Sequence, residues 1–152
     1  MKKTVLSLAM FLAATFAFGQ ELTKEELKQQ KREIKALMGV VGDAEMNIAK
    51  DPEAAAAAVK TALNSPLVNK DAYVWYVSAS AKVGVMNNEN RKRAEGAPFD
   101  EEKLYNYTYE FGNDIAECDK YDNMPDAKGK IKPRYTEFVN MSYGQQFGQF
   151  YN

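Results

Sequence analysis

The stretch DAYVWYVSASAKVGVM (71–86) fits two kinds of secondary structure. Its odd positions from Tyr73 to Val85 are all apolar, an alternation that is typical of a half-buried strand. The same stretch also carries small or apolar residues at helical spacing: Ala72, Tyr76, Ala79, Val83 and Met86. Which period holds decides whether the chain presents a sheet or a helical groove.

The segments before this stretch favour helices, and a cap at Asp100 favours another helix after it. Thr23 and Glu26 have the spacing of a capping box, in which each side chain accepts a hydrogen bond from the other residue's main-chain N–H. An Asp-Pro-Glu sequence at 51–53 supplies a cap, a proline and an acid ahead of a run of alanines. Because capped helices on both sides would leave a lone strand without a partner, we expect 71–88 to be helical, with Trp75 buried.

Residues 101–122 carry a similar ambiguity. Aromatic and polar residues alternate from Tyr105 to Phe111, which favours a short strand. A helix instead gives one continuous apolar face: Leu104, Tyr107, Phe111, Ile115 and Cys118. We expect the helix, because it uses the whole segment and also explains a cap at Asp100.

Two further helices complete the expected fold, one from the capping box onward and one aromatic helix over 134–151. No segment has a motif typical of a sheet interior. We therefore expect an all-α fold of antiparallel helical hairpins, formed by one domain over residues 20–152.

The first 19 residues have the three-part layout of a secretory signal peptide. Lys2 and Lys3 precede the apolar run Val5–Phe16, and Ala17-Phe18-Gly19 places small residues before a cleavage point. The run is too short for a comfortable membrane span. We expect an exported protein, periplasmic or secreted, with no membrane span once the signal is removed.

Four stretches within residues 36–152 follow the expected pairing of helices: PEAAAAAVKTAL (52–63), NSPLVNKDAYVWYV (64–77), PDAKGKIKPRY (125–135) and FGQFYN (147–152). With these stretches the chain resembles tetratricopeptide-repeat proteins, which stack helix–turn–helix units of about 34 residues. More narrowly, it is similar to secreted repeat proteins of the Bacteroidetes.

Within the repeat pattern, Trp75 and Ala79 match two positions of a first helix. Lys82 departs from the pattern, which has Tyr at this place, and the joints 64–70 and 87–99 are longer than a tight repeat turn. Residues 134–152 resemble the first helix of a repeat that lacks its second helix. The resemblance therefore implies a short or truncated member, or a final helix that a partner or a second copy covers.

The residues exclude several kinds of chemistry. The chain has no histidine and no CxxC, HExxH, P-loop or GxGxxG motif, so we expect no enzyme, no cofactor and no metal site. A pair of carboxylates, Asp114 and Glu117, is the remaining catalytic alternative. Cys118 is the only cysteine, which rules out an intramolecular disulfide, and its place on the apolar face favours a buried, inert thiol.

The net charge of −1 argues against a nucleic-acid partner. The leading hypothesis is a non-catalytic helical-repeat protein that binds a protein or peptide in a concave groove. The resemblance implies that Tyr73, Tyr76 and Ser80 face that groove. The alternatives are a glycan- or small-molecule-binding module that uses Tyr105 and Tyr109, with Tyr107 between them, and a periplasmic chaperone-like protein. In the last case residues 134–152 would mediate self-association.

Overall fold

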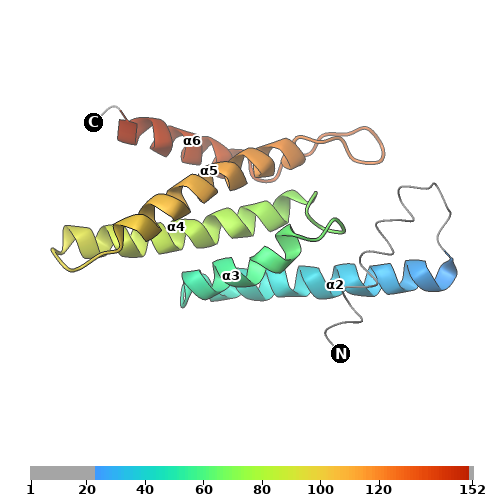
Figure 1. The fold of residues 1–152 in the computed structure, drawn as a ribbon. Helices are drawn as coiled ribbons and strands as arrows, with labels where there is room; N and C mark the ends of the chain where they lie inside the picture. Colours follow the sequence, from blue (N-terminus) through green and yellow to red (C-terminus); the bar gives the residue numbers. More distant parts are fainter. Residues whose placement is uncertain (1–22, 151–152) are drawn as a thin grey trace. The chain divides into compact units, whose positions relative to one another are not determined.

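The computed structural model describes residues 23–150, with side chains up to residue 144. These residues form five helices, shown in Figure 1: α2 (Lys24–Asn47), α3 (Pro52–Leu63), α4 (Ala72–Ala94), α5 (Glu101–Asp122) and α6 (Thr136–Phe150). The described residues contain no strand, which confirms the all-α class. The signal peptide predicted at 1–19 lies outside them.

Local sequence signals set the helix starts as predicted. Thr23 N–H donates to Glu26 at 2.8 Å, and Glu26 N–H donates back to the Thr23 hydroxyl at 3.3 Å. The carboxylates of Asp51 and Asp100 each accept the main-chain N–H three residues further on, at 2.9 and 2.8 Å. Asp71 caps α4 in a related way, through the N–H two residues on at 3.0 Å. Both stretches with ambiguous alternation are therefore helical.

Contacts divide the chain into two units after Ala36, within α2. In the described part of the first unit, the side chains are exposed or partly buried, and Leu27 is 42% exposed. The second unit, from Leu37 onward, contains the buried core. The single domain over 20–152 stays a prediction.

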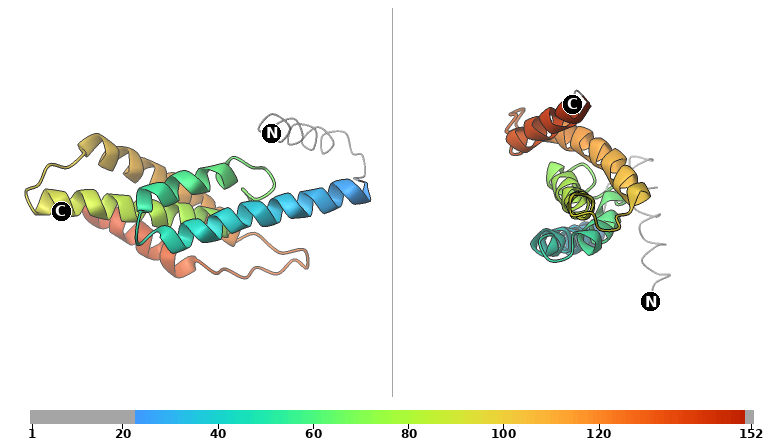
Figure 2. Two further views of the ribbon diagram at one scale, coloured as in Figure 1. Left: turned by 90° about the horizontal axis from the view of Figure 1, so that it is seen from below. Right: turned by 90° about the vertical axis from the view of Figure 1, so that its left-hand side faces the viewer.

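In the second unit α4 is the central helix, because α3 packs against one side of it and α5 against another (Figures 1 and 2). The contact with α3 is built from small and β-branched side chains. Ala55, Val59 and Ala62 of α3 are buried. A Cβ atom at Gly84 of α4 would lie only 2.7 Å from the Cβ of Pro52, so this glycine permits the close approach of α3.

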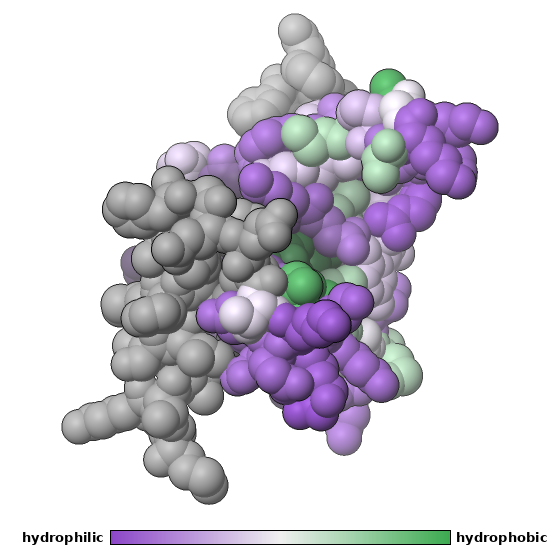
Figure 3. All heavy atoms as spheres, turned by 90° about the vertical axis from the view of Figure 1, so that its right-hand side faces the viewer, coloured by the Kyte–Doolittle hydropathy of each residue, from purple (hydrophilic) through white to green (hydrophobic). Residues whose placement is uncertain are grey.

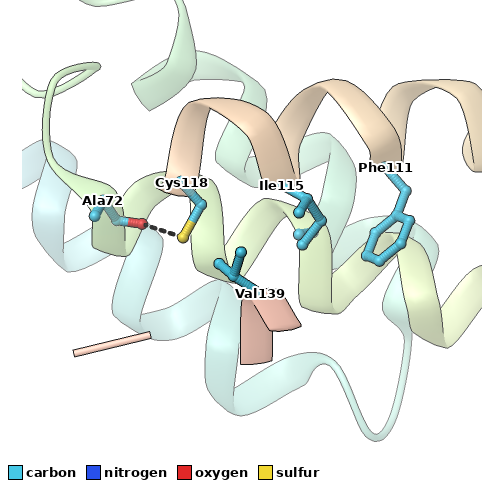
Figure 4. Packing of buried hydrophobic residues seen from close by; sticks show 6 residues of the cluster. Ala72, Phe111, Ile115, Cys118 and Val139 are labelled. Atoms are coloured by element: carbon cyan, nitrogen blue, oxygen red, sulfur yellow. Dashed lines mark hydrogen bonds between the residues drawn. The ribbon is translucent and has the colours of Figure 1, made fainter. Parts of the chain in front are cut away.

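The core between α4, α5 and α6 uses the apolar face predicted for α5. Phe111, Ile115 and Cys118 point from α5 towards Ala72 of α4 and Val139 of α6, as Figure 4 shows. All of these residues are buried. The predicted helical face is therefore confirmed at Phe111, Ile115 and Cys118, whereas Leu104 and Tyr107 are only partly buried.

Cys118 has the buried position that the sequence predicted. Its Sγ lies 3.6 Å from the carbonyl oxygen of Ala72, to which it donates a weak hydrogen bond (Figure 4). Burial raises the pKa of the Cys118 thiol to about 12, because the thiolate would lose its solvation. The thiol is therefore protonated and unreactive at neutral pH.

Trp75 differs from its prediction, since it is partly buried rather than buried. Its indole Nε1 donates to the main-chain oxygen of Asn69 at 2.6 Å. This hydrogen bond ties the start of α4 to the turn before it and gives the polar edge of the ring a partner within the protein.

A buried carboxylate fixes the return of the chain from α5 to α6. Asp122 accepts the main-chain N–H of Arg134 at 2.8 Å and that of Tyr135 at 2.7 Å. The Arg134 guanidinium in turn donates to Asp71 at 3.1 Å. The end of α5, the start of α6 and the cap of α4 are thus joined at one point.

Along the described residues, no helix has the length and apolar character that crossing a membrane requires.

Candidate functional site

A concave site lies between α3 and α5, over α4. This groove has a volume of about 600 Å³. Its residues on α3 are Ala56, Ala57, Lys60 and Leu63; those on α4 are Ser78 and Lys82; those on α5 include Lys103, Asn106, Tyr107, Glu110, Asn113 and Asp114.

The floor of the groove is a buried network of charged and polar side chains. Lys82 Nζ lies 2.7 Å from Asp114 Oδ2 and 3.2 Å from the Glu110 carboxylate. The Ser78 hydroxyl donates to the same Asp114 oxygen at 2.6 Å. Ser78, Lys82 and Asp114 are all buried. The network joins α4 to α5, so it positions the two helices as well as shaping the groove.

Opposing effects act on the pKa of Asp114. Burial raises the pKa of this carboxyl, because the charged form loses solvation. The charge of Lys82 and the hydrogen bonds from Lys82 and Ser78 lower it in part. Among the described residues, every buried side-chain nitrogen or oxygen has a hydrogen-bonding partner. The floor is therefore a satisfied network.

Asp114 and Glu117, the two carboxylates that the sequence left as a catalytic alternative, have separate partners. Asp114 belongs to the groove floor, whereas Glu117 forms an ion pair with Lys120 at 2.8 Å. Glu117 is not among the residues that line the groove. The geometry gives these two carboxylates no shared site for acid–base chemistry.

The two walls of the groove differ in chemistry. On α3, Ala56 and Ala57 present only methyl groups, which leaves space next to α4. On α5, Asn106 and Asn113 are exposed and present amides that can both donate and accept hydrogen bonds, with the partly buried Tyr107 close to them in sequence. This combination of an apolar wall and a polar wall suits a ligand that has both kinds of surface.

The residues predicted to face a groove on α4 lie elsewhere. The hydroxyl of Tyr73 donates to Glu45 of α2 at 2.6 Å, and burial together with this carboxylate raises the pKa of Tyr73. Tyr76 stacks on Tyr135 with ring centroids 4.5 Å apart. Ser80 is partly buried. None of Tyr73, Tyr76 and Ser80 lines the groove, and their role in binding stays a prediction.

The three tyrosines in the first half of α5 divide between two surfaces. Tyr105 and Tyr109 are 71% and 67% exposed, and neither lines the groove. Tyr107 is partly buried and does line it. Residues two positions apart point in different directions on a helix, so the ring of Tyr107 lies apart from those of Tyr105 and Tyr109. An extended strand would have placed all three rings on one face.

The sequence pointed to Lys82 and Asp114 for other reasons, and it did not predict that they meet Ser78 on the floor of a groove. One signal was available, because Lys82 is the only charged residue in the stretch 72–88. A lysine in that position indicates a buried ion pair. The identity of its partner, Asp114, is set by the packing of α4 on α5 and has no local signature.

Comparison of the chain with protein-family models, with curated proteins and with solved structures found no match.

Proposed function

We propose that the chain is a non-catalytic, exported helical-repeat protein that binds a peptide segment of another protein in the groove between α3 and α5. The observation that carries this proposal is the groove itself. Its volume of about 600 Å³ is that of a typical ligand site. Its amide-bearing wall suits the main chain of a peptide, and its alanine wall suits small apolar side chains.

The relation to helical repeats is part of the proposal. Support comes from α3, α4, α5 and α6, which run back and forth along the chain in Figure 1. The starts of α3 and α5 are 49 residues apart, at residues 52 and 101, where the tetratricopeptide repeat has about 34. We therefore propose a stack of long helical hairpins that is related to tetratricopeptide arrays in architecture rather than in repeat length.

The non-catalytic part of the proposal rests on the state of the reactive groups. Lys82 and Asp114 neutralise each other on the floor of the groove. Cys118 is buried, and its pKa is raised to about 12. Cys118 therefore lacks the lowered pKa and the exposure of an activated nucleophile.

The test of peptide binding is a substitution that fills the groove without disturbing the core. Ala57 is an exposed residue of α3 that lines the groove, so A57R places a long side chain in the binding space. We expect A57R to lower the affinity for peptides selected from a displayed library by at least about tenfold, since a blocked hot-spot region costs about 1.4 kcal/mol or more. Calorimetric titration measures the change.

The matched control is A116R, which adds the same side chain to an exposed alanine of α5 that does not line the groove. This variant should bind the selected peptides as the unchanged protein does, and both variants should keep its melting temperature. Equal affinity for A57R and the unchanged protein would show that the selected peptides bind elsewhere.

A second candidate function is glycan binding on the outer face of α5. The observation that favours it is the high exposure of Tyr105 and Tyr109, four residues apart on one helix. Exposed aromatic rings at this spacing form a platform on which sugar rings can stack. We expect that, if this surface is the site, oligosaccharides change the tyrosine fluorescence of the protein and that Y105S/Y109S abolishes the change. A fluorescence change that persists in this double variant would show that the oligosaccharides do not bind at Tyr105 and Tyr109.

A further inference from the structure

We propose that residues 124–134, here called the connector arm, bind the surface of an anionic lipid bilayer. The arm joins α5 to α6 and extends beyond the neighbouring ends of both helices (Figure 1). It is independent of the groove, so this function would add a second interaction surface to the molecule.

The first observation is the charge of the arm. It contains Lys128, Lys130, Lys132 and Arg134 against one acid, Asp126, which gives a net charge of +3. The whole chain has a net charge of −1, so all other residues together carry −4. Because the arm projects from the helices and charges are screened over about 8–10 Å, an anionic surface can meet the arm with little repulsion from the acidic remainder.

The lysines of the arm are available to a partner. All three are exposed. Of these three lysines, only Lys132 has an ion pair with another described residue, and this pair is long, with Nζ 4.0 Å from the Asp126 carboxylate. Arg134 differs, because its guanidinium donates to Asp71 and anchors the base of the arm. The arm therefore has a fixed base and a free cationic end.

The second observation is that large apolar side chains lie exposed among these cations. Ile131 is 56% exposed and Met124 is 52% exposed. Figure 3, which views the side on which the arm projects, shows a mainly hydrophilic surface with hydrophobic groups scattered through it. A nucleic-acid backbone would leave these apolar groups in water, whereas the boundary between headgroups and acyl chains accepts cations and apolar side chains together.

The third observation is that the tip of the arm is already ordered. The Asp126 carboxylate accepts the N–H groups of Lys128 and Lys130 at 2.8 and 2.9 Å. The Asp126 carbonyl accepts from Gly129 at 2.8 Å, and Gly129 has a φ of +73°, which glycine adopts without strain. A preformed turn loses little conformational entropy on docking, so little of the binding free energy that its charges supply is spent on ordering the arm.

The test places an environment-sensitive fluorophore on the arm of the full chain through I131C. The native Cys118 is buried, so a thiol reagent labels only the introduced position. The readout is local to the arm, which matters because the apolar run Val5–Phe16 can itself bind lipid. We expect the emission to shift to shorter wavelength with vesicles of phosphatidylglycerol and phosphatidylcholine, and not with phosphatidylcholine alone.

Removing the three lysines by K128Q/K130Q/K132Q should raise the lipid concentration at half-maximal shift by at least about tenfold. This expectation follows from a contribution of about fivefold for each lysine near an anionic membrane, reduced by screening. The matched control is K28Q/K31Q/K35Q, which makes the same charge change at exposed positions of α2 and should leave the response unchanged.

Three results would overturn the proposal. The first is an unshifted emission with anionic vesicles, and the second is an equal shift with neutral and anionic vesicles. The third is a response of the label to an oligonucleotide or to polyglutamate without any response to vesicles, which would make the arm a site for another class of polyanion.

Discussion

Replacing Lys82 by methionine is expected to lower the free energy of unfolding by about 3 kcal/mol at neutral pH. Methionine keeps most of the length of the side chain, but it leaves the buried Asp114 carboxylate without its cation. The hydrogen bond from Ser78 remains, and by itself it does not offset the desolvation of a full charge. Urea denaturation at pH 7 measures the loss.

The loss should depend on pH in one direction. Burial already raises the pKa of Asp114, and removing the charge of Lys82 raises it further. A carboxyl with a higher pKa in the folded state binds more protons there, so the variant loses stability as the pH rises through that value. It regains stability below the unfolded pKa of about 3.9. The deficit of K82M should thus be smaller near pH 4 than at pH 8.

The double variant K82M/D114L separates the missing charge from damage to packing. Replacing a buried ion pair by apolar side chains of similar size is often neutral, so the double variant should recover most of the stability that K82M loses. A deficit that is unchanged between pH 4 and pH 8, together with no recovery in the double variant, would contradict the assignment of a buried ion pair.

Replacing Asp122 by alanine is the second change with a large expected effect. The variant leaves the N–H groups of Arg134 and Tyr135 without their acceptor at the start of α6. A donor left without a partner costs about 1–3 kcal/mol when it is buried, and these two N–H groups are partly buried, so we expect a loss of about 2 kcal/mol. The Tyr76–Tyr135 stack should loosen with it, because Tyr135 would no longer be held in place. Near-ultraviolet circular dichroism reports that stack, and urea denaturation reports the stability.

D122N provides the control, because its amide oxygen can still accept from one of the two N–H groups. Its loss should fall between those of the unchanged protein and D122A. Unaltered stability and an unaltered tyrosine signal in D122A would show that the chain returns to α6 without this carboxylate.

The sequence predicted the helices well because the decisive signals are local. A cap such as Asp51 or Asp100 and the amides it binds lie within one turn of helix. The alternation around Trp75, taken by itself, favoured a strand. The capped helices predicted on either side left such a strand without a partner, so the sequence as a whole favoured a helix. The face of α5 that carries Ile115 was equally readable, because burial on a single helix leaves a periodic pattern.

The groove was less predictable because it depends on which helices meet. Ser78 and Asp114 are 36 residues apart, and their contact exists only through the packing of α4 on α5. The register of a repeat helix pointed to Tyr76, whose ring instead packs against α6. A periodic pattern shows that a helix has an inner face, but it does not identify the neighbour that covers that face.

The central position of α4 has a consequence for how the chain reaches its folded state. Its extensive contacts are with α3 and α5, the helices immediately before and after it in sequence. Such pairings close short loops, and proteins dominated by them fold in microseconds to milliseconds. We expect α3 and α4 to associate first, with α5 adding next. The aromatic contacts of Tyr135 and Phe138 with Tyr76, which join residues 59 and 62 positions apart in sequence, would then complete folding.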